Sequence, residues 1–184
     1  MASSLGREAS PQGTEEPPVR VLGVDPGTHQ LGFGVLETAA QGPRCLEWGC
    51  LVAKANAPVH VRLHQLWQEL RLVVERWHPH HLAVEEPFVA KERGAKAAVA
   101  VGQAQALALL LAAEAGMEVF RYAPTQVKRA VGDYGAGSKA QLQYMVKLAL
   151  ELPTEPMSLD ASDALAIALC HLRHWSTAQR MSPA

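Results

Sequence analysis

The stretch "VLGVDPGTHQLGFGVLE", at residues 21–37, contains two apolar segments separated by a Pro-Gly pair. Residues 19–24 predict a buried strand, residues 31–37 predict a second strand, and Pro-Gly predicts a tight turn between them. The first apolar segment stops at Asp25. A lone ionised carboxylate is costly to bury unless it is paired, hydrogen-bonded or bound to a metal. The position of Asp25 therefore directs attention to the other acids of the chain.

The pattern continues with alternating strands and helices. A strand over residues 45–52 would complete an antiparallel meander. Helical spacing of apolar residues and the turn residues between segments place the remaining elements: helix 59–77, strand 81–85, helix 95–115, strand 118–121, and helices from Pro124, from Ser138 to about Leu150, and from near Asp160 to about His174. This order predicts an α/β architecture with a hairpin-rich sheet edge followed by crossover units.

Length and composition favour one compact domain. The chain has 184 residues, of which 48% are hydrophobic and 19% charged. We expect a disordered tail over residues 1–18, a single domain over 19–175 and a short C-terminal tail over 176–184. No apolar run reaches the length needed to span a bilayer, and the N-terminus lacks a secretory signal. These features predict a cytoplasmic protein without a membrane partner.

The cysteines do not predict a disulfide framework or a zinc site. The chain has three of them, an odd number, which fits a reducing compartment. Cys45 and Cys50 lie five residues apart on a predicted strand, so their side chains are expected on opposite faces.

Acidic residues stand at the ends of several predicted elements. Asp25 ends the first strand, Glu85 and Glu86 end the fourth, and Asp160 and Asp163 open the last helix on a shared face. A helix packed across the ends of two neighbouring strands would bring these carboxylates together. Clustered carboxylates repel one another unless a divalent cation joins them, and all-oxygen ligands favour Mg²⁺ or Mn²⁺. Two such ions can activate a water and stabilise the leaving oxygen of a phosphodiester.

Each acid also has a purely structural interpretation. Asp25 is a residue type that bonds its own backbone in a turn before Pro-Gly. Asp160 and Asp163 suit an N-cap and a first turn favoured by the helix dipole, and the two glutamates suit a solvated strand end. The sequence leaves these alternatives open.

Five segments together resemble RuvC-type Holliday junction resolvases. They are "GVDPGTHQLGFGVLE", "AVEEPF", "VGQAQA", "YAPTQVKRAVGDYGAGSKAQLQYMV" and "DASDALAIALCH", in this order across nearly all of residues 19–174. The resemblance implies a ribonuclease-H-like five-stranded mixed sheet flanked by helices. It also implies a homodimer that nicks two like-polarity strands of four-way junction DNA beside the RuvA–RuvB branch-migration complex. By motif position, the catalytic and metal-binding acids would be Asp25, Glu85, Asp160 and Asp163, with two Mg²⁺ or Mn²⁺ ions per site.

A basic region accompanies the acidic motifs. Residues 121–147 contain five Lys or Arg residues and a single acid, Asp133. By the resemblance, Lys128 and Lys139 contact DNA phosphates, and Phe88 stacks on bases near the junction point. Arg93 and Lys96 are further candidates for phosphate contacts. Core filling is the structural alternative for Phe88, and a solvated helix face is the alternative for the basic region.

Two other functional classes fit parts of the pattern. Actin- or Hsp70-like ATPases and sugar kinases also begin with a strand, an acid and a glycine-containing hairpin, but they need a second domain for which 184 residues leave no room. A non-catalytic junction-binding module gains nothing from four carboxylates facing DNA phosphates. The helix over residues 95–115 is our candidate for the dimer interface.

Overall fold

The computed structural model describes residues 17–86, 94–132, 139–153 and 158–181. The predicted order of elements is confirmed, with boundaries within about two residues for most of them. The elements are β1 (Arg20–Asp25), β2 (Gln30–Glu37), β3 (Arg44–Val52), α1 (Val59–Trp77), β4 (His81–Glu85), α2 (Gly94–Ala115), β5 (Glu118–Tyr122), α3 (Pro124–Val131), α4 (Lys139–Ala149) and α5 (Leu159–Met181). The largest difference is α5, which continues past His174 to Met181.

The five strands form one mixed sheet in the order β3-β2-β1-β4-β5. The pairs β1–β2 and β2–β3 are antiparallel, as a meander requires, whereas β1–β4 and β4–β5 are parallel. The helices α1 and α2 supply the crossovers that parallel neighbours need. Strand β1 lies in the middle of the sheet and is therefore buried on both faces.

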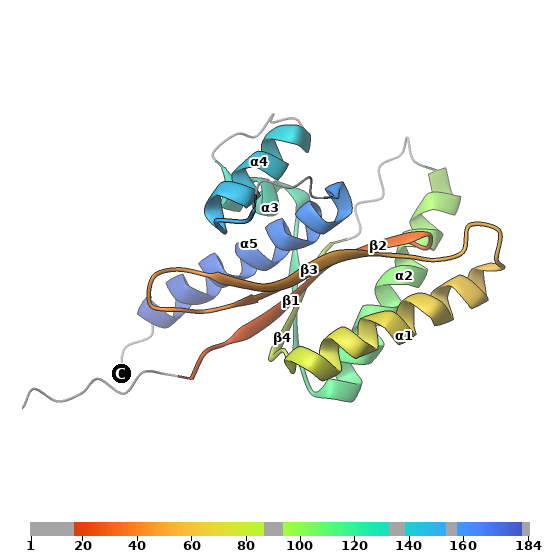
Figure 1. The fold of residues 1–184 in the computed structure, drawn as a ribbon, viewed down its shortest axis with the longest axis horizontal. Coiled ribbons are helices and arrows are strands. Elements are labelled where there is room, and N and C mark those ends of the chain that lie inside the picture. Colours follow the sequence, from red (N-terminus) through yellow and green to blue (C-terminus); the bar gives the residue numbers. More distant parts are fainter. Residues whose placement is uncertain (1–16, 87–93, 133–138, 154–157, 182–184) are drawn as a thin grey trace, which may run out of the picture.

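Helices cover both faces of the sheet (Figure 1). Helix α5 lies against one face with α3 and α4 packed on it, and α1 and α2 cover the other face. Alternation along β1 separates the two cores: Val21 belongs to the α5 side, and Leu22 and Val24 belong to the α1–α2 side. The expected α/β sheet flanked by helices is thus confirmed.

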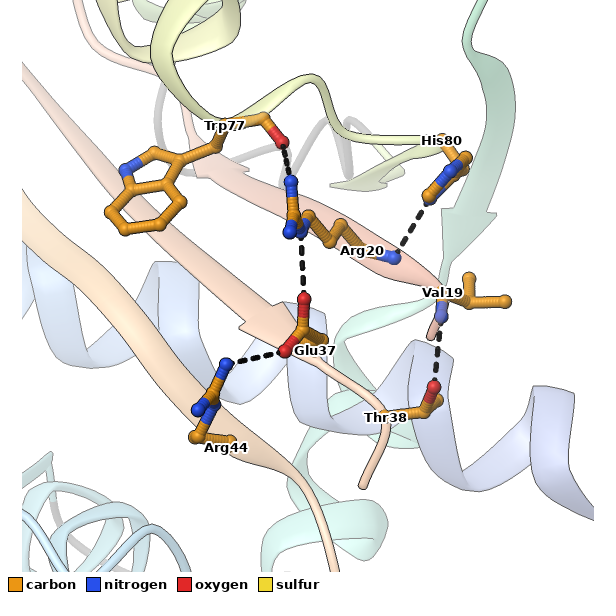
Figure 2. Close-up of polar contacts among 7 residues, drawn as sticks. All are labelled: Val19, Arg20, Glu37, Thr38, Arg44, Trp77 and His80. Carbon is orange, nitrogen blue, oxygen red and sulfur yellow. Dashed lines mark hydrogen bonds and ion pairs between the residues drawn. The ribbon is translucent and has the colours of Figure 1, made fainter. Parts of the chain in front are cut away.

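A buried ion cluster ties three strands at the end of the sheet where β1 begins (Figure 2). The carboxylate of Glu37, only 5% exposed, accepts hydrogen bonds from Arg20 of β1 and Arg44 of β3, each at 2.7 Å. The bond from Arg20 is the main cause of the lowered pKa of Glu37, against the opposing effect of burial. Arg20 also donates to the carbonyl of Trp77 at the end of α1. The cluster fixes the alignment of these strands, and hence which residues stand at their opposite ends.

Helix α2 contradicts one expectation. Residues Ala95–Ala115 are long and apolar enough to cross a membrane by length and composition, so the expectation that no segment could span a bilayer is wrong. Lys96, Gln103 and Gln105 interrupt its apolar residues, but the mean hydropathy of the helix as a whole stays high. Only 28% of its most apolar window is buried, although Ala108, Leu111 and Ala112 pack into the core beneath α1.

Candidate active site

Asp25 and Glu85 lie side by side at the ends of two parallel strands. Residues 24 and 84 are paired in the register of β1 and β4, so the next residue of each strand is an acid. Val24 and Val84 point into the α1–α2 core. By alternation, Asp25 and Glu85 point to the face that α5 covers, and both are half-buried. Glu86, the other acid of the pair, is exposed.

Helix α5 approaches this edge closely because glycines stand beneath it. A Cβ atom on Gly32 of β2, the residue paired with Asp25, would overlap the backbone oxygen of Asp160. A Cβ on Gly23 of β1 would overlap the backbone oxygen of Ala164. Side chains at these positions would push the helix away from the sheet, so the glycines of the opening motif set the distance between Asp160 and the strand ends.

The first turn of α5 is capped by Ser158 and not by an aspartate. The Oγ atom of Ser158 accepts a hydrogen bond from the backbone N–H of Ala161 at 3.1 Å, the geometry of an N-cap. The Ser162 hydroxyl donates to the Ser158 carbonyl at 2.8 Å. The capping role proposed as an alternative for Asp160 therefore belongs to Ser158. Asp160 and Asp163 both lie half-buried in the first two turns of the helix.

Cys50 is a neighbour of the acids that the sequence did not single out. It faces Gly32 across the β2–β3 pair, so Asp25, Gly32 and Cys50 form a row over three strands. The thiol donates to Oδ2 of Asp160 at 3.6 Å. Burial, followed by the charge of Asp160, raises the pKa of Cys50 to about 11. The group is therefore a protonated donor near neutral pH.

The prediction that Cys45 and Cys50 lie on opposite faces of their strand is wrong for a structural reason. Cys45 packs in the core on the α5 side, and Cys50 also faces α5 through Asp160. Residues 35 and 36 of β2 pair with Glu47 and Cys45, so Leu46 is an extra residue in β3. This β-bulge reverses the alternation between the two cysteines, and they share a face.

The donor set fits a hard divalent cation. The acids of the site offer carboxylate oxygens, which Mg²⁺ and Mn²⁺ prefer, and the one soft group, Cys50, is protonated. Within the described part of the chain, no three His, Cys, Asp or Glu side chains lie close enough together to hold a metal by themselves. Asp25, Glu85 and Asp160 thus lie at one edge of the sheet, and the described side chains there do not form a closed coordination shell.

The predicted DNA-binding residues are only partly described. Lys128 is exposed on α3, and Lys96 is exposed in the first turn of α2. Lys139 is the first residue of α4, and its side chain is outside what the structure describes. Phe88 and Arg93 also lie outside the described residues.

Comparisons with known proteins cover most of the chain. The profile of the family "Crossover junction endodeoxyribonuclease RuvC" matches residues 21–171. A RuvC of Chloroflexus aggregans is 46% identical over 162 residues, which are 88% of this chain and 98% of that protein. A RuvC of Pelotomaculum thermopropionicum is 42% identical over 161 residues, 88% of this chain and 97% of that protein.

Solved structures agree with this result. T. thermophilus RuvC in complex with a Holliday junction substrate superposes with a TM-score of 0.79 and 34% identity, covering 87% of this chain and 96% of that one. The yeast mitochondrial resolvase Ydc2 shares the fold at 13% identity, with a TM-score of 0.60 over 88% of this chain and 82% of that one. With the family profile and the relatives of similar length in agreement, the chain belongs to the RuvC family of crossover junction endodeoxyribonucleases.

Proposed function

We propose that this protein is a metal-dependent DNA endonuclease that resolves Holliday junctions in homologous recombination and DNA repair. It nicks two like-polarity strands of a four-way junction symmetrically. The observation that carries the proposal is the convergence of Asp25, Glu85 and the first turns of α5 on one edge of the sheet. Family membership and the junction bound to the T. thermophilus relative support it.

Asp25, Glu85, Asp160 and Asp163 are the proposed ligands of two divalent ions, Mg²⁺ or Mn²⁺. When bound, the ions supply an activated water and neutralise charge on the leaving oxygen. The chain's own contribution is placement. Neighbouring strand ends hold Asp25 and Glu85, the Ser158 cap fixes the first turn of α5, and the Cys50 thiol orients the carboxylate of Asp160.

The basic residues have a separate proposed role in holding DNA. Exposed ammonium groups on Lys128 and Lys96 are free to meet phosphates as point charges. Lys139 and Arg93 are proposed to do the same, and Phe88 to stack on bases near the junction point. Such contacts make binding sensitive to salt.

Two nicks per junction require two active sites, and we propose that a homodimer provides them. Helix α2 offers the interface. Val99 and Leu110 are 59% and 58% exposed, and they share a helix face because they lie eleven residues, about three turns, apart. An apolar face of this kind on a helix already packed into the fold suits a second copy of the chain. Cytoplasmic work beside the RuvA–RuvB complex completes the proposal.

The deciding experiment uses a synthetic four-way junction. The protein is incubated with the junction and Mg²⁺ or Mn²⁺, and the products are resolved strand by strand. We expect paired nicks at symmetric positions in two like-polarity strands, and none with EDTA. Equal cutting of linear duplex would instead identify a general nuclease, and binding without nicking would favour a non-catalytic junction module.

A further inference from the structure

An open cleft of about 420 Å³ lies between α3 and the C-terminal half of α5. Its lining residues are Gln126, Arg129, Ala130, Arg173, His174 and Thr177. Two of them carry a positive charge, and no Asp or Glu stands among them. The cleft is therefore cationic and rich in hydrogen-bond donors.

The two helices present matching faces to this cleft. Val127 and Val131 are the buried residues of α3, and Gln126, Arg129 and Ala130 lie together on one flank of that buried edge. Lys128 lies on the opposite flank. Lys128 and Arg129 are therefore adjacent in sequence but lie on different surfaces of α3. On α5, residues 173, 174 and 177 share one face by the same spacing.

Neither arginine of the cleft is neutralised within the described chain. The ion pairs found there use Arg20, Arg44, Arg71 and Arg76. No carboxylate among the described residues pairs with Arg129 or Arg173. The His174 ring is held in place by stacking on Tyr122, with ring centroids 5.4 Å apart and planes 24° from parallel. Two arginine forks beside a fixed wall suit a phosphate, which guanidinium groups bind bidentately.

The cleft is separate from the edge of the sheet that carries Asp25 and Glu85, which we call the carboxylate edge. One DNA substrate is nevertheless long enough to contact both. Arg173 follows Asp163 by ten residues on α5, a distance of about 15 Å along the helix. Successive nucleotides of one B-form strand advance about 3.4 Å, so about four or five of them cover this span.

We propose that Arg129 and Arg173 bind a backbone phosphate of a junction arm about four or five nucleotides from the cleaved bond. This inference rests on the proposed junction-resolving function and adds an anchoring site for the arm. Its role is to align the arm along α5 while the carboxylate edge receives the junction point.

The test is a double-mutant cycle between protein and DNA. Binding of a four-way junction is measured in EDTA, so that the DNA stays intact, for wild type and the R129A/R173A variant. Each protein is also given a junction with neutral methylphosphonates at the fourth and fifth linkages from the nick site. The R71A variant is the control, because it removes an exposed arginine from α1 on the other side of the sheet.

We expect R129A/R173A to bind about tenfold more weakly and to lose about one to two units from the slope of log K against log salt. R71A should change neither quantity. Methylphosphonates should weaken wild type but add nothing further to the double variant. An R129K/R173K variant should keep the salt slope and lose part of the affinity, because lysine retains the charge without the fork.

Equal affinity and equal salt slope for wild type and R129A/R173A would overturn the inference. So would methylphosphonates that weaken binding by R129A/R173A as much as they weaken binding by wild type. A parallel assay with Mg²⁺ separates this failure from that of the proposed function. If wild type nicks the junction while R129A/R173A binds as tightly, only the cleft assignment fails. If wild type does not nick, the function itself is wrong.

Discussion

The proposed chemistry depends most directly on Asp25. Replacing it with asparagine keeps the size of the side chain and removes the charge at the end of β1. We expect Asp25→Asn to lower the nicking rate by at least about a hundredfold, because a proposed metal ligand is lost. Junction binding should stay within a few-fold of wild type, since the proposed phosphate contacts are elsewhere. Strand nicking and gel-shift affinity measured on one preparation separate the two effects.

Glu86→Gln is the matched control for this change. It removes an acid next to the site, but one that is exposed while its neighbour Glu85 is half-buried on the α5 face. We expect wild-type nicking from Glu86→Gln. An Asp25→Asn protein that nicks as fast as wild type would remove Asp25 from the proposed ligands.

Cys50 makes a prediction about metal affinity rather than about the fold. Its thiol donates to Asp160, a proposed ligand, and loss of such a supporting bond commonly weakens metal binding or activity. We expect Cys50→Ala to raise the Mg²⁺ concentration for half-maximal nicking by about tenfold, with a smaller change at saturating metal. Cys50→Ser keeps a donor and should restore most of the affinity.

Cys45→Ala provides the comparison for a purely structural effect. Cys45 lies on the same strand and face, where burial raises its pKa to about 12, but it packs in the core. Its removal should affect thermal stability more than the metal titration. Identical Mg²⁺ titrations for wild type and Cys50→Ala would show that the thiol does not position Asp160.

At the scale of elements, hydrophobic periodicity and turn residues were sufficient to predict the strands and helices. The neighbouring positions of β1 and β4 also followed from the pattern of strand, crossover and strand. The bulge at Leu46 could not be predicted, because one extra residue does not change the apolar pattern of the segment. Without the bulge, the contact between Cys50 and Asp160 could not be predicted either. The Ser158 cap was readable in principle as a serine before the last helix. Roles in metal and DNA binding stay predictions.

The exposed face of α2 gives a prediction about assembly. A charge at Leu110 would be buried between two copies of the chain if this face is the dimer interface. We expect wild type to behave as a dimer and Leu110→Glu as a monomer in sedimentation or light-scattering measurements. Its nicks should then become unpaired, since the two sites no longer act on one junction together.

Leu72→Glu tests whether any surface charge would do the same. Leu72 is also 58% exposed, but it lies on α1. This variant should remain dimeric and cut both strands. A monomeric wild type, or a Leu110→Glu protein that stays dimeric, would exclude α2 as the interface.

At the scale of the whole molecule, a buried polar chain joins β4, β5 and α5. Nδ1 of His81 lies 2.9 Å from Nε2 of His171, and the Tyr122 hydroxyl lies 2.8 Å from Nδ1 of His171. His171 is only 1% exposed. Burial, with the nearby His81 as a second cause, lowers the pKa of His171 from 6.5 to about 3. The folded protein therefore holds this imidazole neutral.

The buried contacts among His81, His171 and Tyr122 predict that the protein loses stability in acid. Because the unfolded chain protonates His171 near pH 6.5 and the folded chain does so only near pH 3, the unfolded state binds more protons between these values. The contribution of the neutral His171 to stability is then present above about pH 6.5, and it falls by about 1.4 kcal/mol per pH unit between pH 6.5 and about pH 3. Urea unfolding at pH 7 and pH 5.5, at fixed protein concentration, measures the change.

The His171→Gln variant should flatten the pH dependence of stability even if it lowers stability at pH 7. His64→Gln removes an exposed histidine of α1 and should keep the wild-type slope. Equal pH slopes for wild type and His171→Gln would show that the buried chain accepts a proton without cost, contrary to its burial and its two short contacts.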